Sequence, residues 1–340
     1  MLLGYQIMSL TPRPFSCCCC NHTQATPAGS YLLSTLCDEP LYEDYYEIPC
    51  PMVACTNCSH VTIHPLPSEV IDGIKRYFTD GHHWESHGMN TAFSEQSLDE
   101  NLTHNPGLWE RFHRAKRQLA FILSQVDVPD NAKILDVGSG FAPFLYHCRH
   151  HGFENLYALE PFAEICRFLN GQGIITYPML VETFITRDDL PQFDLVVLSQ
   201  VLEDLIEPAE VLCGLRRLLS ENGVLFIEVP YGQHHNPYSR SLHPHFFNET
   251  SLARLLHTCG YQPMVLRTDR LNGVDALVQK AIHFVYVRTF FQQRSTVQEI
   301  LESPLLKYLH PYCWRPLKWL LRLKMNIMIP SENLTAIATR

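Results

Sequence analysis

The sequence of 340 residues contains no run of 18 apolar residues, so a membrane-spanning helix is not predicted. Its first 15 residues have no basic region followed by an apolar stretch, and we therefore expect no signal peptide. Positive charge is scarce, because 26 Lys and Arg stand against 35 Asp and Glu, a net charge of -9. A protein that binds along the nucleic-acid phosphate backbone needs a basic face, so this balance argues against nucleic acid as a partner.

Charged residues make up only 18% of the chain and hydrophobic residues 46%, which predicts a sizeable core, and the length predicts about two domains. Basic residues gather near the C-terminus, where residues 281–340 contain 8 basic and 3 acidic side chains. Residues 307–329 mix Trp and Leu with Lys and Arg. We predict a helical insert over residues 284–329 that caps the substrate cleft, with peripheral contact to an anionic membrane through 307–329 as the alternative.

Cysteine is abundant, with 13 residues, an odd number. Several cysteines lie inside apolar segments, for example Cys148 and Cys259, which indicates reduced thiols and a cytoplasmic location.

Two C-x-x-C pairs stand near the N-terminus, and each can present two thiolates to one ion. Together they would complete the tetrahedral sulfur site of a structural zinc ion in a zinc-ribbon-like domain, residues 1–78. The predicted ligands are Cys17, Cys20, Cys55 and Cys58. Two alternatives stay open: unligated thiols, or a site in which Cys18 or Cys19 replaces one of these ligands. Otherwise Cys18 and Cys19 have no assigned role.

The segment SHVTIHPLPSEVIDGIKRYF after the second pair predicts a short strand, a turn and a helix with Ser68 as its N-cap. Residues 79–105 are polar and without periodicity, which is typical of a linker or a lid.

From residue 106 onward helical and strand patterns alternate. LWERFHRAKRQLAFILSQV has apolar residues at helical spacing, and KILDVGSGFAPF predicts a buried strand, a glycine turn and a helix that begins at Pro143. Further strands are predicted in NLYALEP, GIITYP, FDLVVLS and GVLFIEVP, with a helix over Pro208–Leu219 that is broken at Asn222-Gly223. This order predicts an α/β domain over residues 106–340, a parallel sheet with helices on both faces.

Ligands of such sheets bind at the carboxyl ends of the strands. Glu160 follows a strand about 20 residues after the glycine turn, where a carboxylate can bind both hydroxyls of a ribose, as in NAD and other nucleoside cofactors. The NAD fingerprint G-x-G-x-x-G/A would require Gly or Ala at position 143, and Pro143 stands there.

Taken in order, the motifs LDVGSGFAPFL, YALEP, FDLVVLSQVLEDL, LRRLLSENGVLFIEVP and HPHFFNETSLARLLHTCGYQP resemble those of class I S-adenosylmethionine (SAM) methyltransferases with an N-terminal zinc ribbon. The resemblance covers roughly residues 15–280, and LSTLCDEPL with the two C-x-x-C pairs also resembles the zinc domain of nucleotide-sugar C-methyltransferases. The resemblance implies a Rossmann-like sheet of seven strands, with YQPMVLRTD as the sixth strand and ENLTAIATR as an antiparallel seventh. Two positions depart from it: Ala142 replaces the third glycine, and Glu203-Asp204 replaces a Glu-His pair.

The resemblance also implies a role for each residue at the strand ends. Asp136, Gly138 and Gly140 would hold the methionine part of SAM, Glu160 the ribose, Leu180 to Glu182 the adenine, and Ser199 and Gln200 the methyl-transfer side.

The loop YGQHHNPYSRSLHPHFF follows the fifth strand at this same edge of the sheet. Histidine is the side chain best suited to accept a proton near neutral pH. The resemblance places an acceptor-side histidine just before FFNETSLARLL, which makes His243 and His245 the candidate catalytic bases and Tyr238 the reserve. The alternative is that these histidines make structural hydrogen bonds only.

These observations predict a SAM-dependent methyltransferase with a structural Zn²⁺, acting on a small or lipid-linked metabolite, with O-methylation favoured over C- or N-methylation. The alternatives are a nicotinamide-dependent oxidoreductase and a non-catalytic zinc-ribbon scaffold with a degenerate cofactor fold. An RNA methyltransferase is disfavoured by the net charge.

Overall fold

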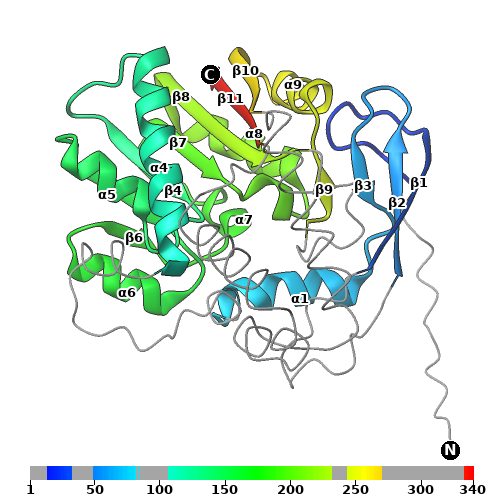
Figure 1. The fold of residues 1–340 in the computed structure, drawn as a ribbon, viewed down its shortest axis with the longest axis horizontal. Helices are drawn as coiled ribbons and strands as arrows, with labels where there is room; N and C mark the ends of the chain where they lie inside the picture. Colours follow the sequence, from blue (N-terminus) through cyan, green and yellow to red (C-terminus); the bar gives the residue numbers. More distant parts are fainter. Residues whose placement is uncertain (1–13, 33–48, 82, 84–105, 232–242, 270–332) are drawn as a thin grey trace, which may run out of the picture. The chain divides into compact units, whose positions relative to one another are not determined.

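The structure is a computed structural model, and it describes residues 14–32, 49–81, 83, 106–231, 243–269 and 333–340. Strands within these ranges form one sheet of four strands and one of seven (Figure 1). The 284–329 insert with its 307–329 segment, Tyr238, and all but residues 79–81 and 83 of the linker lie outside the described residues. No described helix is long and apolar enough to cross a membrane.

The seven-stranded sheet has the order β10-β11-β8-β7-β4-β5-β6. Its strands are β4 (Lys133–Val137), β5 (Asn155–Leu159), β6 (Ile175–Tyr177), β7 (Phe193–Ser199), β8 (Leu219–Pro230), β10 (Gln262–Asp269) and β11 (Asn333–Thr339). β4 pairs in parallel with β5 and β7, β5 with β6, and β7 with β8, whereas β11 pairs antiparallel with β8. The predicted sheet and its antiparallel last strand are therefore confirmed.

Helices cover both faces of this sheet. They are α4 (Pro106–Gln125), α5 (Pro143–His150), α6 (Ala163–Gly171), α7 (Val181–Phe184), the 3₁₀ helix η2 (Leu202–Asp204), α8 (Pro208–Leu218) and α9 (Glu249–Thr258). Alternate residues of a strand point to opposite faces, so Ile134 joins a core with α4, α5 and α6, and Leu135 joins a core with α7, α8 and α9. Every strand in the middle of the sheet is thus buried on both sides.

One predicted boundary is wrong. The helix expected over Pro208–Leu219 ends at Leu218, and β8 begins at Leu219 and runs through Asn222-Gly223, which the sequence indicates as a break. The pairing of β8 with β7 jumps from Leu219 to Val224, so the turn residues form an irregularity inside the strand and not its start.

The N-terminal module has its own sheet of four antiparallel strands. Its members are β1 (Ala25–Leu32), β2 (Pro49–Cys55), β3 (Val61–Ile63) and β9 (His245–Phe246), paired in that order. Helix α1 (Ser68–Thr79) packs Val70 and Ile74 against this sheet. The N-cap of α1 is Pro67 and Ser68 is the first helical residue, so the N-cap predicted at Ser68 is off by one position.

β9 lies between β8 and α9 in the chain, more than 180 residues after β3. This strand is not predicted by the sequence. Two side chains of the same region strengthen the contact: the Asn248 amide donates to the Ser59 carbonyl (2.8 Å) and the Thr258 hydroxyl to the Cys19 carbonyl (2.9 Å). The loop after β8 is thereby fastened to the N-terminal module.

Candidate active site and metal centre

The glycine turn after β4 is held against the end of β5. Gly138 and Gly140 both have positive φ angles, +66° and +54°, which L side chains rarely adopt. The amide of Gly138 donates to the Leu159 carbonyl (2.8 Å), as does that of Ser139 (3.2 Å). Ala142 also lies in the left-handed region, at φ +53°, just before Pro143 begins α5. This explains why a glycine is the usual residue there.

Glu160 follows β5 directly and is almost fully buried. Its carboxylate accepts hydrogen bonds from the amides of Gly140 (3.0 Å) and Phe162 (3.2 Å). The residue predicted to bind the ribose therefore also braces the glycine turn. Each carboxylate oxygen has two acceptor positions, so it can accept more than one hydrogen bond.

Asp136 lies in β4 and is also almost fully buried. Burial and, to a smaller extent, the nearby Glu160 carboxylate raise the pKa of its carboxyl to about 8, although Arg114 opposes the shift. With this pKa, the Asp136 carboxyl is mostly protonated at neutral pH in the free protein. A cationic ligand nearby would lower the pKa and favour the ionised carboxylate.

Helix α4 contributes polar groups that the sequence analysis missed. The amide of Gln118 donates to the Ser199 hydroxyl (2.8 Å) and to Oε1 of Glu228 (2.9 Å), and Arg114 Nε lies 3.9 Å from the same oxygen. The signal was present, since Gln118 falls on the otherwise apolar buried stripe of Leu119 and its neighbours. A polar residue on such a stripe indicates a buried partner.

These groups meet around one cavity at the carboxyl end of β4. It is lined by Arg111, Arg114, Ala115, Gln118, Asp136, Gly138, Ser139, Phe141, Pro143, Phe144 and Ser199. Of the predicted cofactor residues, Asp136, Gly138 and Ser199 line it directly. Gly140 belongs to the same glycine turn as Gly138, and its amide donates to Glu160.

The remaining two predicted cofactor residues lie elsewhere at strand ends. Leu180 is half-buried and precedes α7 as its N-cap. Gln200 has φ +59° and donates its backbone amide to the Glu228 carbonyl (2.8 Å), with its side-chain amide 3.4 Å from Oδ1 of Asn333. The end of β7 is thus tied to β8 and β11.

His243 pairs with Asp204, Nδ1 to Oδ1 at 2.6 Å. Burial lowers the pKa of His243, but the Asp204 carboxylate more than offsets this, and the net direction is upward. Asp204 occupies the position where the resemblance leads one to expect a histidine, so the histidine of this pair comes from the loop after β8. The adjacent Glu203 is buried, burial raises its pKa to about 8, and its carboxylate oxygens have no hydrogen-bond partner among the described residues.

His245, the second predicted base, faces the N-terminal module. Its ring stacks on His60 (centroids 5.3 Å apart), with its Nδ1 3.1 Å from His60 Nε2 and 3.2 Å from the Thr62 hydroxyl. Its Nε2 lies 3.3 Å from the Ile206 carbonyl. The two predicted bases therefore have different surroundings: His245 contacts the N-terminal module, and His243 contacts Asp204.

The two C-x-x-C pairs form matching knuckles. The amide of Asn21 donates to the Cys17 carbonyl (2.8 Å) and that of Ser59 to the Cys55 carbonyl (2.9 Å), and both Asn21 and Ser59 have φ +57°. Each knuckle therefore turns its two thiols to the same side.

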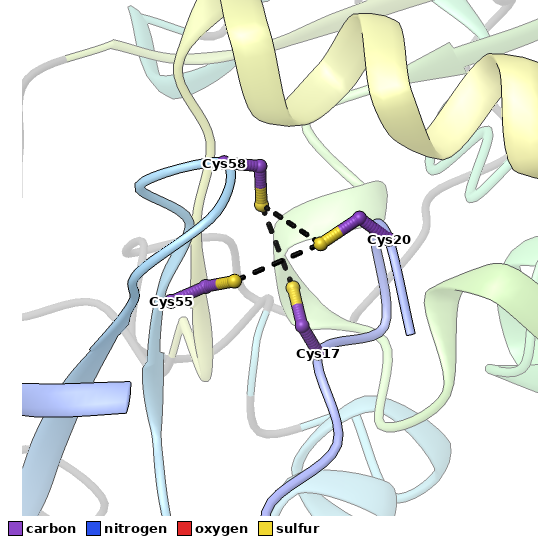
Figure 2. Close-up of side chains that lie close together, drawn as sticks. All are labelled: Cys17, Cys20, Cys55 and Cys58. Carbon is purple, nitrogen blue, oxygen red and sulfur yellow. Dashed lines mark hydrogen bonds between the residues drawn. The ribbon is translucent and has the colours of Figure 1, made fainter. Parts of the chain in front are cut away.

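The four sulfur atoms meet between the knuckles (Figure 2). Their separations are 3.6 Å for Cys17–Cys58, 3.7 Å for Cys20–Cys55 and 3.6 Å for Cys20–Cys58, and all four lie within 4.8 Å of one another. A tetrahedral zinc ion with Zn–S bonds of about 2.3 Å requires S···S separations of about 3.8 Å. The sulfur atoms present therefore fit a zinc ion.

Comparisons with known proteins agree with this fold. Residues 108–265 match the family model described as "Methyltransferase domain". The chain is 22% identical over 241 residues to the C-methyltransferase NovU of Streptomyces niveus, covering 68% of this chain and 50% of that protein. It thus spans about half the length of this curated relative.

Two solved structures are also similar. A SAM-dependent methyltransferase from Archaeoglobus fulgidus has 14% identity and a TM-score of 0.43, covering 72% of this chain and 98% of its own. Magnesium protoporphyrin IX methyltransferase from Synechocystis PCC 6803 has 8% identity and a TM-score of 0.46, covering 80% and 99%. The family match assigns residues 108–265 of the chain to a methyltransferase domain.

Proposed function

We propose that the protein transfers the methyl group of SAM to a small or lipid-linked metabolite. The observation that carries this is a cavity lined by Asp136 and Gly138 at the carboxyl end of β4, beside the glycine turn whose Gly140 amide donates to Glu160. Bound SAM supplies an electrophilic methyl group, so most of the protein's work is to position the two reactants. The net charge of -9 argues against nucleic acid as the acceptor.

The charges around the cavity suit the amino-acid end of SAM. Asp136 faces the same cavity as Arg111 and Arg114. The Asp136 carboxylate could pair with the ammonium group of the ligand, and an arginine guanidinium could pair with its carboxylate. Gly138 and Gly140 let the ligand approach the backbone of the turn, and Glu160 would accept from the ribose hydroxyls. Leu180 to Glu182 would flank the adenine, and Ser199 and Gln200 would line the transfer side.

His243, held by Asp204, is the proposed base at the acceptor. The carboxylate fixes the ring orientation and leaves Nε2 to take the proton of the acceptor as the new bond forms. An oxygen acceptor is our first choice because a hydroxyl is a weak nucleophile that gains from such a base. The atom that carries the new methyl group in the product shows whether the acceptor is oxygen, carbon or nitrogen.

The four-cysteine cluster would hold one Zn²⁺. A shell of four thiolates leaves no open coordination position, so this zinc stabilises the N-terminal module and takes no part in methyl transfer. The buried thiols here and at Cys148 suit a reducing compartment such as the cytoplasm.

Thermal denaturation with SAM, S-adenosylhomocysteine, NAD and RNA tests the proposed cofactor. A ligand stabilises only the fold that binds it, by about 2.7 kcal/mol at 100 times its Kd. We expect SAM and S-adenosylhomocysteine to raise the Tm and NAD and RNA to leave it unchanged. A rise with NAD alone would assign the site to an oxidoreductase.

Gly138→Val is expected to weaken SAM binding by more than about 100-fold. A Cβ at Gly138 would lie 2.6 Å from Cγ2 of Val201, at a φ of +66°. The clash is with Val201, and it would push the turn out of place. Isothermal titration calorimetry with SAM measures the effect.

Gly173→Val is the matched control, because Gly173 has φ +76° and nothing lies within 4 Å of its added Cβ. It should keep the affinity of the parent protein. Gly138→Ala combined with Val201→Ala removes the clashing methyl and should recover much of the binding. A Gly138→Val protein that is folded and binds SAM normally would remove the glycine turn from the site.

SAM binding is expected to strengthen as the pH rises from 6 toward 8. The pKa of Asp136 is about 8 in the free protein, and the cationic ligand favours its ionised form. Below pH 8, SAM binding must therefore release a proton from Asp136. The affinity for SAM then falls by up to a factor of about ten for each unit by which the pH decreases. Calorimetry at pH 7 in two buffers of different ionisation enthalpy should show release of about one proton. Asp136→Asn, neutral at every pH, should bind weakly without this release, and equal proton release in both proteins would contradict the assignment.

A further inference from the structure

A second group of metal-ligand side chains lies beside the four-cysteine cluster. Cys18 and Cys19 stand between the ligands of the first knuckle, His60 follows the second knuckle, and His245 belongs to β9. Cys19 and His60 are fully buried, and His245 is 7% exposed. We name these four residues the Cys₂His₂ cluster.

Three separations within this cluster are close to those of ligands around one ion. Sγ of Cys18 lies 3.7 Å from Sγ of Cys19 and 3.9 Å from Nδ1 of His245, and Nδ1 of His245 lies 3.1 Å from Nε2 of His60. Tetrahedral zinc requires about 3.8 Å for S···S, about 3.6 Å for S···N and about 3.4 Å for N···N. The ligand atoms of Cys18, Cys19 and His60 also lie within 4.8 Å of one another.

Without an ion these groups are poorly satisfied. Nε2 of His60 faces Nδ1 of His245, while Nδ1 of His60 is buried and has no hydrogen-bond partner among the described residues. Thiols are weak hydrogen-bond donors and acceptors, so they compensate little for the water that burial removes. A metal ion bound by these side chains would give the thiolates and one nitrogen of each imidazole a strong partner.

The surroundings already orient His245 as a ligand. Its Nε2 lies 3.3 Å from the Ile206 carbonyl, which can only accept, so the proton is held on Nε2 and Nδ1 is left with a lone pair toward the cluster. Ligating histidines commonly donate their other nitrogen to a carbonyl or carboxylate in this way.

We propose that Cys18, Cys19, His60 and His245 bind a second zinc ion next to the four-cysteine zinc. Two thiolates and two imidazoles in tetrahedral arrangement are a zinc donor set. Each thiol gives its proton to solvent when the ion binds, so the loaded second site is neutral and adds no buried charge. Cys19 belongs to the same buried cluster as Cys17 and Cys58, so the two ions would lie in adjoining sites.

The second ion would join parts of the chain that the first does not. All ligands of the first zinc belong to the N-terminal module, whereas the Cys₂His₂ cluster spans 227 residues from Cys18 to His245. The second zinc ion would therefore link the first knuckle to β9. Its ligand His245 lies two residues after His243.

Zinc content and zinc X-ray absorption of the full-length protein test the proposal. We expect two zinc ions per chain with an average shell of three sulfur atoms and one nitrogen. Cys18→Ser combined with Cys19→Ser should lower the content from two ions to one and convert the shell to four sulfur atoms. Cys50→Ser, which changes a buried cysteine of the same module outside both clusters, should keep two ions and the mixed shell.

If the parent protein contains one zinc ion per chain, the proposal of a second zinc ion is wrong, whether the shell is four sulfur atoms or a mixture of sulfur and nitrogen. The absorption spectrum of the parent decides this even where a variant fails to fold. Two ions that persist in the Cys18→Ser and Cys19→Ser protein would likewise remove these residues from the site.

Discussion

Replacing Cys55 with Ser is expected to remove the four-cysteine zinc and to unfold β1, β2 and β3, while the seven-stranded sheet stays folded. Within the described part of the N-terminal module, the apolar core that packs on α1 has seven buried members and is small. Structural zinc supplies about 10–16 kcal/mol of apparent binding free energy in isolated zinc modules, and that free energy drives their folding. Hydrogen exchange followed by mass spectrometry should show fast exchange in residues 14–32 and 49–63 and slow exchange in β4, β5 and β7.

Cys50→Ser is the control for this experiment also, because it makes the same chemical change at a fully buried cysteine outside the four-sulfur cluster. It should lose some stability, since a buried hydroxyl replaces a thiol, but it should keep the four-cysteine zinc and slow exchange in β2. A Cys55→Ser protein with unchanged zinc content and protection would show that Cys55 is not a ligand.

The second large effect is expected at the acceptor. His243→Ala should lower kcat by about 10²–10⁴-fold and leave the Kd for SAM unchanged, because the imidazole acts on the acceptor's proton and not on the cofactor. Asp204→Asn keeps the shape of the pair but removes the charge that orients the ring, so a smaller loss of kcat is expected. Steady-state kinetics with the identified acceptor, together with calorimetry for SAM, measures both quantities.

His150→Ala serves as the matched control, since His150 is exposed at the end of α5 and its Nδ1 lies 3.0 Å from the Tyr146 carbonyl. It should keep the kcat of the parent. His245→Ala should alter zinc content before it alters the SAM complex. Full activity in His243→Ala would exclude a histidine base at this position.

Much of the seven-stranded sheet could be predicted because its signals are local. Buried runs such as Ile134–Val137 end at a glycine turn or a proline. These residues locate the ends of the strands even when the neighbouring strands of the sheet are unknown. β9 has no such signal. It consists of two residues that become a strand only because Thr62, far away in the sequence, stands opposite His245. Pairing over such a distance is a property of the folded chain.

The same distinction separates the site residues. Asp136, Gly138 and Ser199 follow from strand ends and turn chemistry, and the cavity they line agrees. The partners Gln118 and Asp204 could not be assigned, because a hydrogen bond to Glu228 or His243 depends on how helices and loops pack.

The four consecutive cysteines pose a related problem. Spacing shows that Cys17 and Cys20 can share an ion, but the direction of the Cys18 and Cys19 side chains is decided by the backbone of the knuckle. Only the structure places them toward His60 and His245.

The pairing of β9 with β3 has a consequence for the inheritance of the N-terminal module. A gene fusion or recombination event at the linker would exchange residues 1–78 but leave His245 and Phe246 with the recipient. The hybrid would then join a foreign β3 to a native β9, and the amide of Asn248 would lack its fitted carbonyl at Ser59. A stable hybrid requires the 243–248 segment to match the incoming module. The two stretches should therefore change together among descendants, as one heritable unit divided between two places in the gene.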